Sequence, residues 1–63
     1  MLSEKVKKYR EERKFSKMEL SRISGVSHRT IEFLENGKID NPTLKTLVSL
    51  ARALKVDVEE LIK

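Results

Sequence analysis

The stretch from Ser16 to Lys38 constrains the fold of this chain more than any other segment, because it carries the start and stop signals of two short helices. Ser16 precedes the first helix and Glu19 follows three residues later, which is the spacing of a capping box. Gly25 lies where that helix has to end, a place that favours a residue tolerant of positive φ. Ser27 then offers a hydroxyl to the free N–H groups of the second helix. Two helices joined by a turn of about four residues are expected to cross steeply, as in a helix-turn-helix unit.

Capping residues and apolar spacing predict five helices, and no segment alternates at period two for long enough to indicate a strand. The first three helices are expected over residues 3–13, 17–24 and 28–36, and the pair Asn36-Gly37 then breaks the helical pattern. The expected inward side chains of these helices are Leu2, Val6, Tyr9, Leu20, Ile23, Ile31 and Leu34.

The fourth helix is expected to begin at Asn41-Pro42, with Asn41 as the cap and Pro42 at the first helical position, and to run to Leu54. A short fifth helix follows Asp57 as its cap, with Glu60 three residues later. The expected inward side chains here are Leu44, Leu47, Val48, Ala51, Leu54, Val58, Leu61 and Ile62.

The 63 residues leave room for one small domain. We therefore expect residues 1–63 to form an all-α, compact five-helix bundle with a central helix-turn-helix, and no separate effector-binding or catalytic module. No apolar run approaches the ~18 residues of a membrane span, and the basic start lacks the apolar core of a signal peptide. A cytoplasmic protein without a membrane partner is the expectation.

Several kinds of chemistry lack the residues they need. The chain has no cysteine and one histidine, His28, so neither a disulfide framework nor the usual zinc site can be built. Nothing indicates the orienting group and oxyanion hole that a serine–histidine pair would need. The two glycines, Gly25 and Gly37, do not make a phosphate-binding loop. We expect no enzyme, no metal site and no cofactor.

The formal net charge is +4, and it is unevenly distributed. Residues 1–14 hold six of the fourteen basic side chains and three of the ten acidic ones. A basic end on a small domain is what binding to a phosphate backbone requires. A solvated lysine-rich helix surface would have the same composition, so the charge alone leaves both interpretations open.

Two charged residues fall on inward-facing helical positions. Arg10 lies between Val6 and Arg13 on the apolar stripe of the first helix, and Glu35 lies beside Ile31 on the third. Each alone would be a costly buried charge. The favoured interpretation is that they pair, with the guanidinium fork meeting the carboxylate; the alternative is that both side chains extend to water.

The third helix places an unusual set of side chains opposite Ile31. Arg29 and Phe33 are predicted to point away from the core, Glu32 lies to one side, and His28 lies nearer the flank. In a DNA groove, Arg can bind the O6 and N7 of guanine, Glu can accept from cytosine, and Phe can pack on a thymine methyl. A contact with a partner protein, or incidental exposure of Phe33, would explain the same pattern.

Motifs from Leu2 to Ile62 match one family pattern in combination. They are Lys7-Lys8-Tyr9-Arg10, Ser16 with Leu20, Ser24-Gly25-Val26-Ser27, Thr30-Ile31, Leu34-Glu35-Asn36-Gly37-Lys38, Asn41-Pro42-Thr43-Leu44, Leu47, Leu50-Ala51-Arg52-Ala53-Leu54, Val56 and Glu60-Leu61. On these residues the chain resembles the lambda-repressor-like, XRE-type helix-turn-helix family, which includes phage repressor and Cro proteins.

The resemblance implies roles for particular residues. The third helix would be the recognition helix, with base-reading positions at His28, Arg29, Glu32 and Phe33. DNA phosphates would be contacted from Lys17, Ser27, Asn36 and Lys38. The positions of Arg10 and Glu35 match those of an internal ion pair in the family. Two departures stand out, since Lys17 occupies a place where glutamine is common and Lys55 a place where glycine is common.

We therefore expect a sequence-specific DNA-binding transcriptional regulator that acts as a repressor and inserts the third helix, about residues 28–36, into the major groove of double-stranded DNA. A homodimer is expected, because one recognition helix reads few base pairs, with a dimer contact near Val56–Leu61 if those residues do not close the core instead. The alternative is a protein-interaction module, antitoxin-like or an adaptor, that binds a partner protein with the same helix. A membrane-surface role for the first helix is disfavoured, because Arg10 and Arg13 interrupt its apolar stripe.

Overall fold

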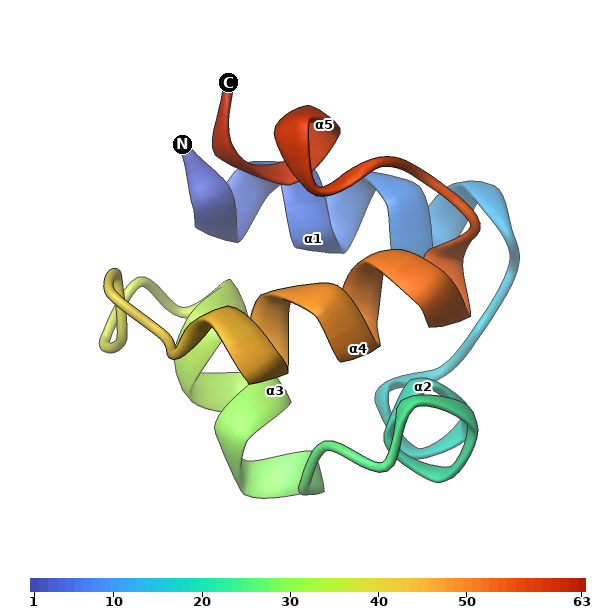
Figure 1. The fold of residues 1–63 in the computed structure, drawn as a ribbon. Helices are drawn as coiled ribbons and strands as arrows, with labels where there is room; N and C mark the ends of the chain where they lie inside the picture. The colour runs from blue at the N-terminus through green and yellow to red at the C-terminus, as the bar shows by residue number, and fades with distance from the viewer.

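The computed structural model describes all residues, 1–63, and contains five helices and no strand. The helices are α1 (Leu2–Glu12), α2 (Lys17–Ser24), α3 (His28–Glu35), α4 (Leu44–Leu54) and α5 (Val58–Ile62). In Figure 1, α1 and α5 lie above α4, and α2 and α3 lie below it. The two chain ends lie near each other beside α1 and α5 (Figure 1). The predicted all-α bundle with a central helix-turn-helix is confirmed, and no helix has both the length and the apolar character that a membrane span requires.

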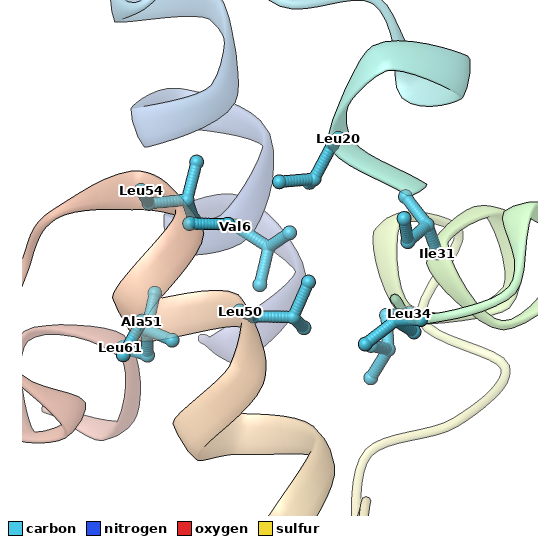
Figure 2. Packing of buried hydrophobic residues seen from close by; sticks show 10 residues of the cluster. Val6, Leu20, Ile31, Leu34, Leu50, Ala51, Leu54 and Leu61 are labelled. Carbon is cyan, nitrogen blue, oxygen red and sulfur yellow. The ribbon is translucent and has the colours of Figure 1, made fainter. Parts of the chain in front are cut away.

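Every helix contributes to one apolar core. Figure 2 shows side chains from all five helices converging, and the seven fully buried ones are Val6, Leu20, Ile31, Leu34, Leu50, Leu54 and Leu61. Helix α1 contacts α3, α4 and α5, and α2 contacts α3 and α4. The helix-turn-helix is therefore held from behind by α1 and α4, which fixes how α3 is presented to solvent.

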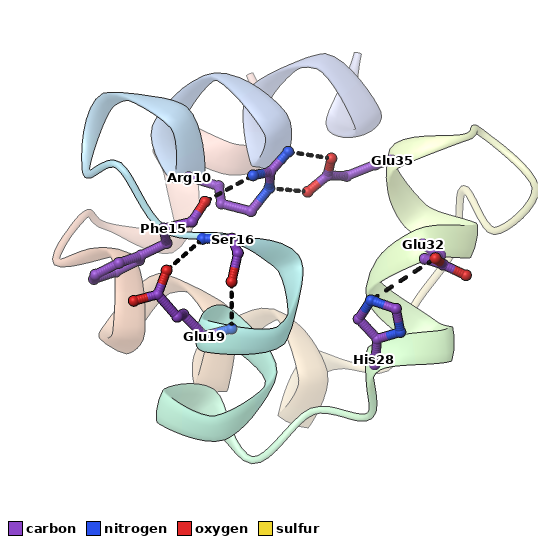
Figure 3. Close-up of polar contacts among 7 residues, drawn as sticks. All are labelled: Arg10, Phe15, Ser16, Glu19, His28, Glu32 and Glu35. Carbon is purple, nitrogen blue, oxygen red and sulfur yellow. Dashed lines mark hydrogen bonds and ion pairs between the residues drawn. The ribbon is translucent and has the colours of Figure 1, made fainter.

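Helix α2 begins with the predicted capping box. The Glu19 N–H donates to Ser16 Oγ at 3.0 Å, and the Ser16 N–H donates to Glu19 Oε1 at 2.8 Å. Hydrogen bonding from Ser16 to the carboxylate, chiefly from the Ser16 backbone N–H, favours the ionised form and lowers the pKa of Glu19. The first turn of α2 is thus closed by its own side chains (Figure 3).

The predicted cap of α4 was wrong, and the predicted cap of α5 is confirmed in position without a side-chain hydrogen bond. Helix α4 begins after Thr43, whose hydroxyl accepts from the Thr46 N–H at 3.2 Å, so Asn41 and Pro42 lie in the preceding loop. Asn and Thr are both good N-caps, and the apolar spacing of α4 fits either start. Asp57 occupies the N-cap position of α5 but makes no side-chain cap bond. The carboxylate of Glu60 instead accepts from the Tyr9 hydroxyl at 3.1 Å, which raises the pKa of Tyr9.

Three residues predicted to face inward are exposed: Ile23 by 49%, Leu44 by 70% and Ile62 by 60%. Ile23 is the second-last residue of α2, Leu44 is the first of α4 and Ile62 is the last of α5. The helical repeat predicts a direction around the axis and carries no information on where the neighbouring helix ends.

Two lysines hold left-handed backbone conformations, and both follow a helix. Lys14 has φ 59° and Lys55 has φ 57°. After α4, the Lys55 N–H donates to the Arg52 carbonyl at 3.2 Å and the Val56 N–H to the Ala51 carbonyl at 3.0 Å, the pattern of a Schellman motif. Arg13 Nε also donates to the Leu54 carbonyl at 2.6 Å, so the end of α4 is tied to α1.

We expect Lys55→Gly to stabilise the fold by about 0.5–1 kcal/mol, because glycine relieves the strain of the left-handed conformation and loses part of that gain to backbone entropy. Urea unfolding of the variant measures the change. Lys55→Ala is the matched control, since it removes the charge and retains the Cβ. Equal stability of the glycine and alanine variants would contradict the assignment of strain to Lys55.

Candidate nucleic-acid interface

The turn between α2 and α3 is fixed by backbone conformation and by local hydrogen bonds. Gly25 has φ +78° and its N–H donates to the Ser21 carbonyl at 2.9 Å, which ends α2. The Val26 N–H donates to Ser24 Oγ at 3.1 Å, and the Val26 side chain is buried in the core. Ser27 Oγ accepts from the Thr30 N–H at 3.1 Å and caps α3. In Figure 1, α2 is seen almost end-on whereas α3 lies across the view, so the two helices cross steeply, as the sequence predicted.

The orientation of α3 is set by its buried side. Ile31 and Leu34 are fully buried, and Leu20 of α2 packs in the same cluster (Figure 2). With these positions inside, the opposite side of α3 must face solvent. We call the side chains His28, Arg29, Glu32 and Phe33 the outer face of α3.

The predicted ion pair anchors the far end of α3 to α1. Arg10 Nε and Nη2 donate to the two Glu35 carboxylate oxygens at 2.6 Å and 3.0 Å, and Arg10 Nη1 donates to the Phe15 carbonyl at 2.7 Å (Figure 3). The side chains are 11% and 3% exposed, respectively. The hydrogen bonds to Glu35 raise the pKa of Arg10. A bidentate pair of this kind fixes orientation as well as distance, so α3 cannot rotate about its axis without breaking it.

The outer face carries charges of both signs. Arg29 is exposed and belongs to no ion pair. His28 Nε2 lies 3.8 Å from Glu32 Oε1, one turn apart on α3, and both side chains are about two-fifths exposed (39% and 43%) (Figure 3).

Phe33 is less exposed than the sequence predicted. Its ring is half-buried and is not among the side chains that pack on the core cluster. The ring is covered by neighbours on its own side of the molecule, since Arg29 Cζ lies 5.5 Å and Lys38 Nζ 5.7 Å from its centroid. The helical repeat placed the side chain correctly at the surface, but it could not predict the approach of Lys38 from the loop after α3.

The four candidate phosphate contacts lie at the ends of α2 and α3. Lys17 is the first residue of α2, Ser27 caps the start of α3, and Asn36 and Lys38 follow its end. Asn36 and Lys38 are exposed and Lys17 is half-buried. The Ser27 hydroxyl donates to Thr30 Oγ1 at 2.8 Å, so its proton is already engaged. Their contacts with DNA remain predictions.

The link between Lys38 and Phe33 had no signal in the sequence. The Lys38 N–H donates to the Phe33 carbonyl at 2.9 Å and the Gly37 N–H to the Leu34 carbonyl at 3.2 Å, which is again a Schellman motif. Gly37 has φ +77°, so the chain turns back over the end of α3. The Arg29–Phe33 contact, by contrast, follows from the four-residue spacing on a helix and could have been predicted.

The outer face of α3 lines none of the three hollows on the molecule. The hollows on the molecule are lined by other residues, for example Tyr9, Phe15, Leu54 and Val56 between α1 and the end of α4. An eight-residue helix is about 12 Å long, and the major groove of B-DNA is about 12 Å wide. An exposed charged helix of this length suits that groove, and its outer face forms no small-molecule cleft.

A helix-turn-helix family model matches residues 6–61 of the chain. The transcriptional repressor RghR of Bacillus subtilis is 42% identical over 59 residues, which are 94% of this chain and 44% of the repressor. An uncharacterised helix-turn-helix transcriptional regulator of Archaeoglobus fulgidus is 35% identical over 57 residues, which are 90% of this chain and 79% of the regulator. The chain thus spans less than half the length of the first relative and most of the second.

Solved structures of the biofilm regulator SinR have the same fold. The SinR structure in complex with DNA superposes with a TM-score of 0.97 at 28% identity and is covered in full by this chain. The N-terminal DNA-binding domain of SinR from Bacillus subtilis also gives 0.97, with 91% of it covered. SinR in complex with the SinI protein gives 0.95, with 61% of that chain covered. The likeness extends over all of this chain in each comparison.

Proposed function

Because the chain belongs to the lambda-repressor-like, XRE-type helix-turn-helix family, we propose that it regulates transcription by inserting α3 into the major groove of specific DNA sites. The observation that carries the proposal is the outer face of α3, where an exposed arginine without an ion-pair partner stands on a helix fixed from behind by the core. The relatives are regulators and one similar structure holds DNA. We infer a repressor, in line with RghR, and place the protein in the cytoplasm with the DNA.

Base readout is assigned to His28, Arg29, Glu32 and Phe33. Arg29 is the group with free donors for guanine O6 and N7, and Glu32 can accept from a cytosine amino group. Lys17, Ser27, Asn36 and Lys38 are assigned to the phosphates on either side of the groove. We propose no catalytic step, metal or cofactor, since the outer face offers donors and acceptors for recognition alone.

Two copies are proposed to bind half-sites about one helical turn apart, since one short helix contacts few base pairs. The corner Val56–Leu61 does not supply a free apolar contact, because Leu61 is fully buried and Val56 and Val58 pack on the core. The large apolar side chains left exposed on α4 and α5 are Leu44 and Ile62.

Salt dependence separates DNA binding from the alternative, a partner protein bound by the same face. For a random-sequence duplex, we expect log affinity to fall linearly with log salt, by about 0.9 for each phosphate neutralised. Lys38→Ala should reduce that slope by about one. Lys63→Ala is the matched control, because Lys63 is exposed and faces Glu59 at 3.6 Å, away from α3. An affinity that is insensitive to salt, or no binding to duplex at low ionic strength, would contradict the proposal.

A further inference from the structure

The ring of Phe33 is held in an arrangement that the core does not explain. It is half-buried, yet it is absent from the set of partly buried side chains that pack on the core cluster, which includes Phe15 and Tyr9. Its neighbours are instead two cations, Arg29 with Cζ 5.5 Å and Lys38 with Nζ 5.7 Å from the ring centroid. The ring therefore lies outside the core cluster and next to two cations.

Both cations are brought to the ring by fixed backbone. Arg29 lies four residues before Phe33 on α3, where side chains meet along one face of a helix. Lys38 returns to the ring through the Schellman motif at the end of α3, with Gly37 at φ +77° and the Lys38 N–H bonded to the Phe33 carbonyl at 2.9 Å. The three side chains form what we call the Phe33 platform.

A cation held by a ring keeps its hydrogen-bond donors. The attraction acts between the positive charge and the face of the ring, so the N–H groups stay free at the edge of the guanidinium. An ion pair would occupy those donors, and neither Arg29 nor Lys38 takes part in any ion pair of the structure. An arginine side chain also loses considerable rotamer freedom when it is fixed, and the platform fixes part of it before DNA arrives.

We infer that Phe33 is a positioning residue for specificity: its ring holds Arg29 ready for bidentate binding to a guanine and Lys38 ready for the neighbouring phosphate. The inference rests on the proposed function and refines it. Phe33 then acts through Arg29, which differs from a direct contact between the ring and a thymine methyl.

The test uses the duplex that the protein selects from random sequences, with guanine replaced by 7-deazaguanine at the position that Arg29 contacts. This base lacks the N7 acceptor, so the wild-type protein should lose about tenfold in affinity. The variant Phe33→Leu keeps apolar volume and removes the ring. In this variant we expect the affinity loss caused by 7-deazaguanine to be roughly two- to fivefold smaller than in the wild-type protein. Phe33→Tyr retains the ring, so 7-deazaguanine should lower its affinity as much as it lowers that of the wild-type protein.

A second replacement separates the two roles of the ring. Deoxyuridine in place of each thymine removes the 5-methyl group. One outcome would show that Phe33 contacts DNA directly and would overturn the inference. In it, Phe33→Leu leaves the affinity loss caused by 7-deazaguanine unchanged and abolishes only the affinity loss caused by deoxyuridine. If no duplex binds at low ionic strength, the proposed function itself fails.

A measurement on the free wild-type protein does not depend on any variant folding. We expect ¹⁵N relaxation to show Arg29 Nε less mobile than Arg52 Nε, because Arg52 is exposed on α4 and belongs to no ion pair. The Arg29 side-chain protons should also be shifted upfield by the ring. Equal mobility of the two arginines and no ring shift would overturn the inference.

Discussion

Glu35→Ala is expected to lower the free energy of unfolding by about 3–5 kcal/mol, because it leaves the buried guanidinium of Arg10 without its carboxylate partner. For a domain of this size, each kcal/mol corresponds to a shift of roughly 4–8 °C in the melting temperature. Glu35 is 3% exposed at its side chain and accepts from Arg10 twice, at 2.6 Å and 3.0 Å. Thermal and urea unfolding followed by circular dichroism measure the loss.

Glu32→Ala is the matched control, since Glu32 is on the same helix and its side chain is 43% exposed. We expect it to change the unfolding free energy by no more than about 0.5 kcal/mol. Replacing both partners with apolar residues, Arg10→Met with Glu35→Leu, should cost less than Glu35→Ala alone, since no unpaired charge is then buried. A melting temperature unchanged by Glu35→Ala would refute the structural role of the pair.

Arg29→Ala is expected to weaken binding to the selected duplex by about 1–3 kcal/mol, which is roughly 5- to 150-fold, while the fold stays intact. The side chain is exposed and makes no ion pair, so its removal leaves no buried group unsatisfied. Affinity for a random-sequence duplex should fall much less, because a base contact contributes only at its own site. Fluorescence anisotropy with both duplexes gives the two values.

Arg52→Ala removes an equal charge from the exposed surface of α4 and serves as the control for net charge. If Arg29→Ala weakens binding to the selected and random duplexes equally, Arg29 contacts only phosphate. The assignment of base readout to this residue would then be wrong.

Local sequence signals predicted most of the fold. The capping box at Ser16 and Glu19, the glycine at position 25 and the cap at Ser27 placed α2 and α3 within one residue of their observed ends. These features act through neighbouring backbone groups, so the sequence alone specifies them. The start of α4 was misplaced because Asn41 and Thr43 are both residues that favour the N-cap position, and the observed cap is Thr43.

The solvent exposure of a side chain was harder to predict than the direction in which it points around its helix. Ile23, Leu44 and Ile62 have inward-facing spacing and are still 49–70% exposed, and each lies at or next to a helix end. The left-handed conformation of Lys14 could not be predicted either, because the glycine that usually marks such a position is absent from the sequence there.

Side-chain positions of the site that are set by the helical repeat could be predicted, and those set by the path of a loop could not. The spacing of Arg29 and Phe33 along α3, and the inward positions of Arg10 and Glu35, follow from the helical repeat. The approach of Lys38 to the Phe33 ring depends on the turn at Gly37, whose path a helical repeat does not describe.

The most direct test of the central claim is an NMR spectrum of the protein bound to the selected duplex, recorded for intermolecular nuclear Overhauser effects. The account predicts cross-peaks from the Arg29 side chain to major-groove protons, such as cytosine H5. Cross-peaks that instead join another helix to the duplex, or that reach only minor-groove sugar protons, would contradict the insertion of α3 into the major groove.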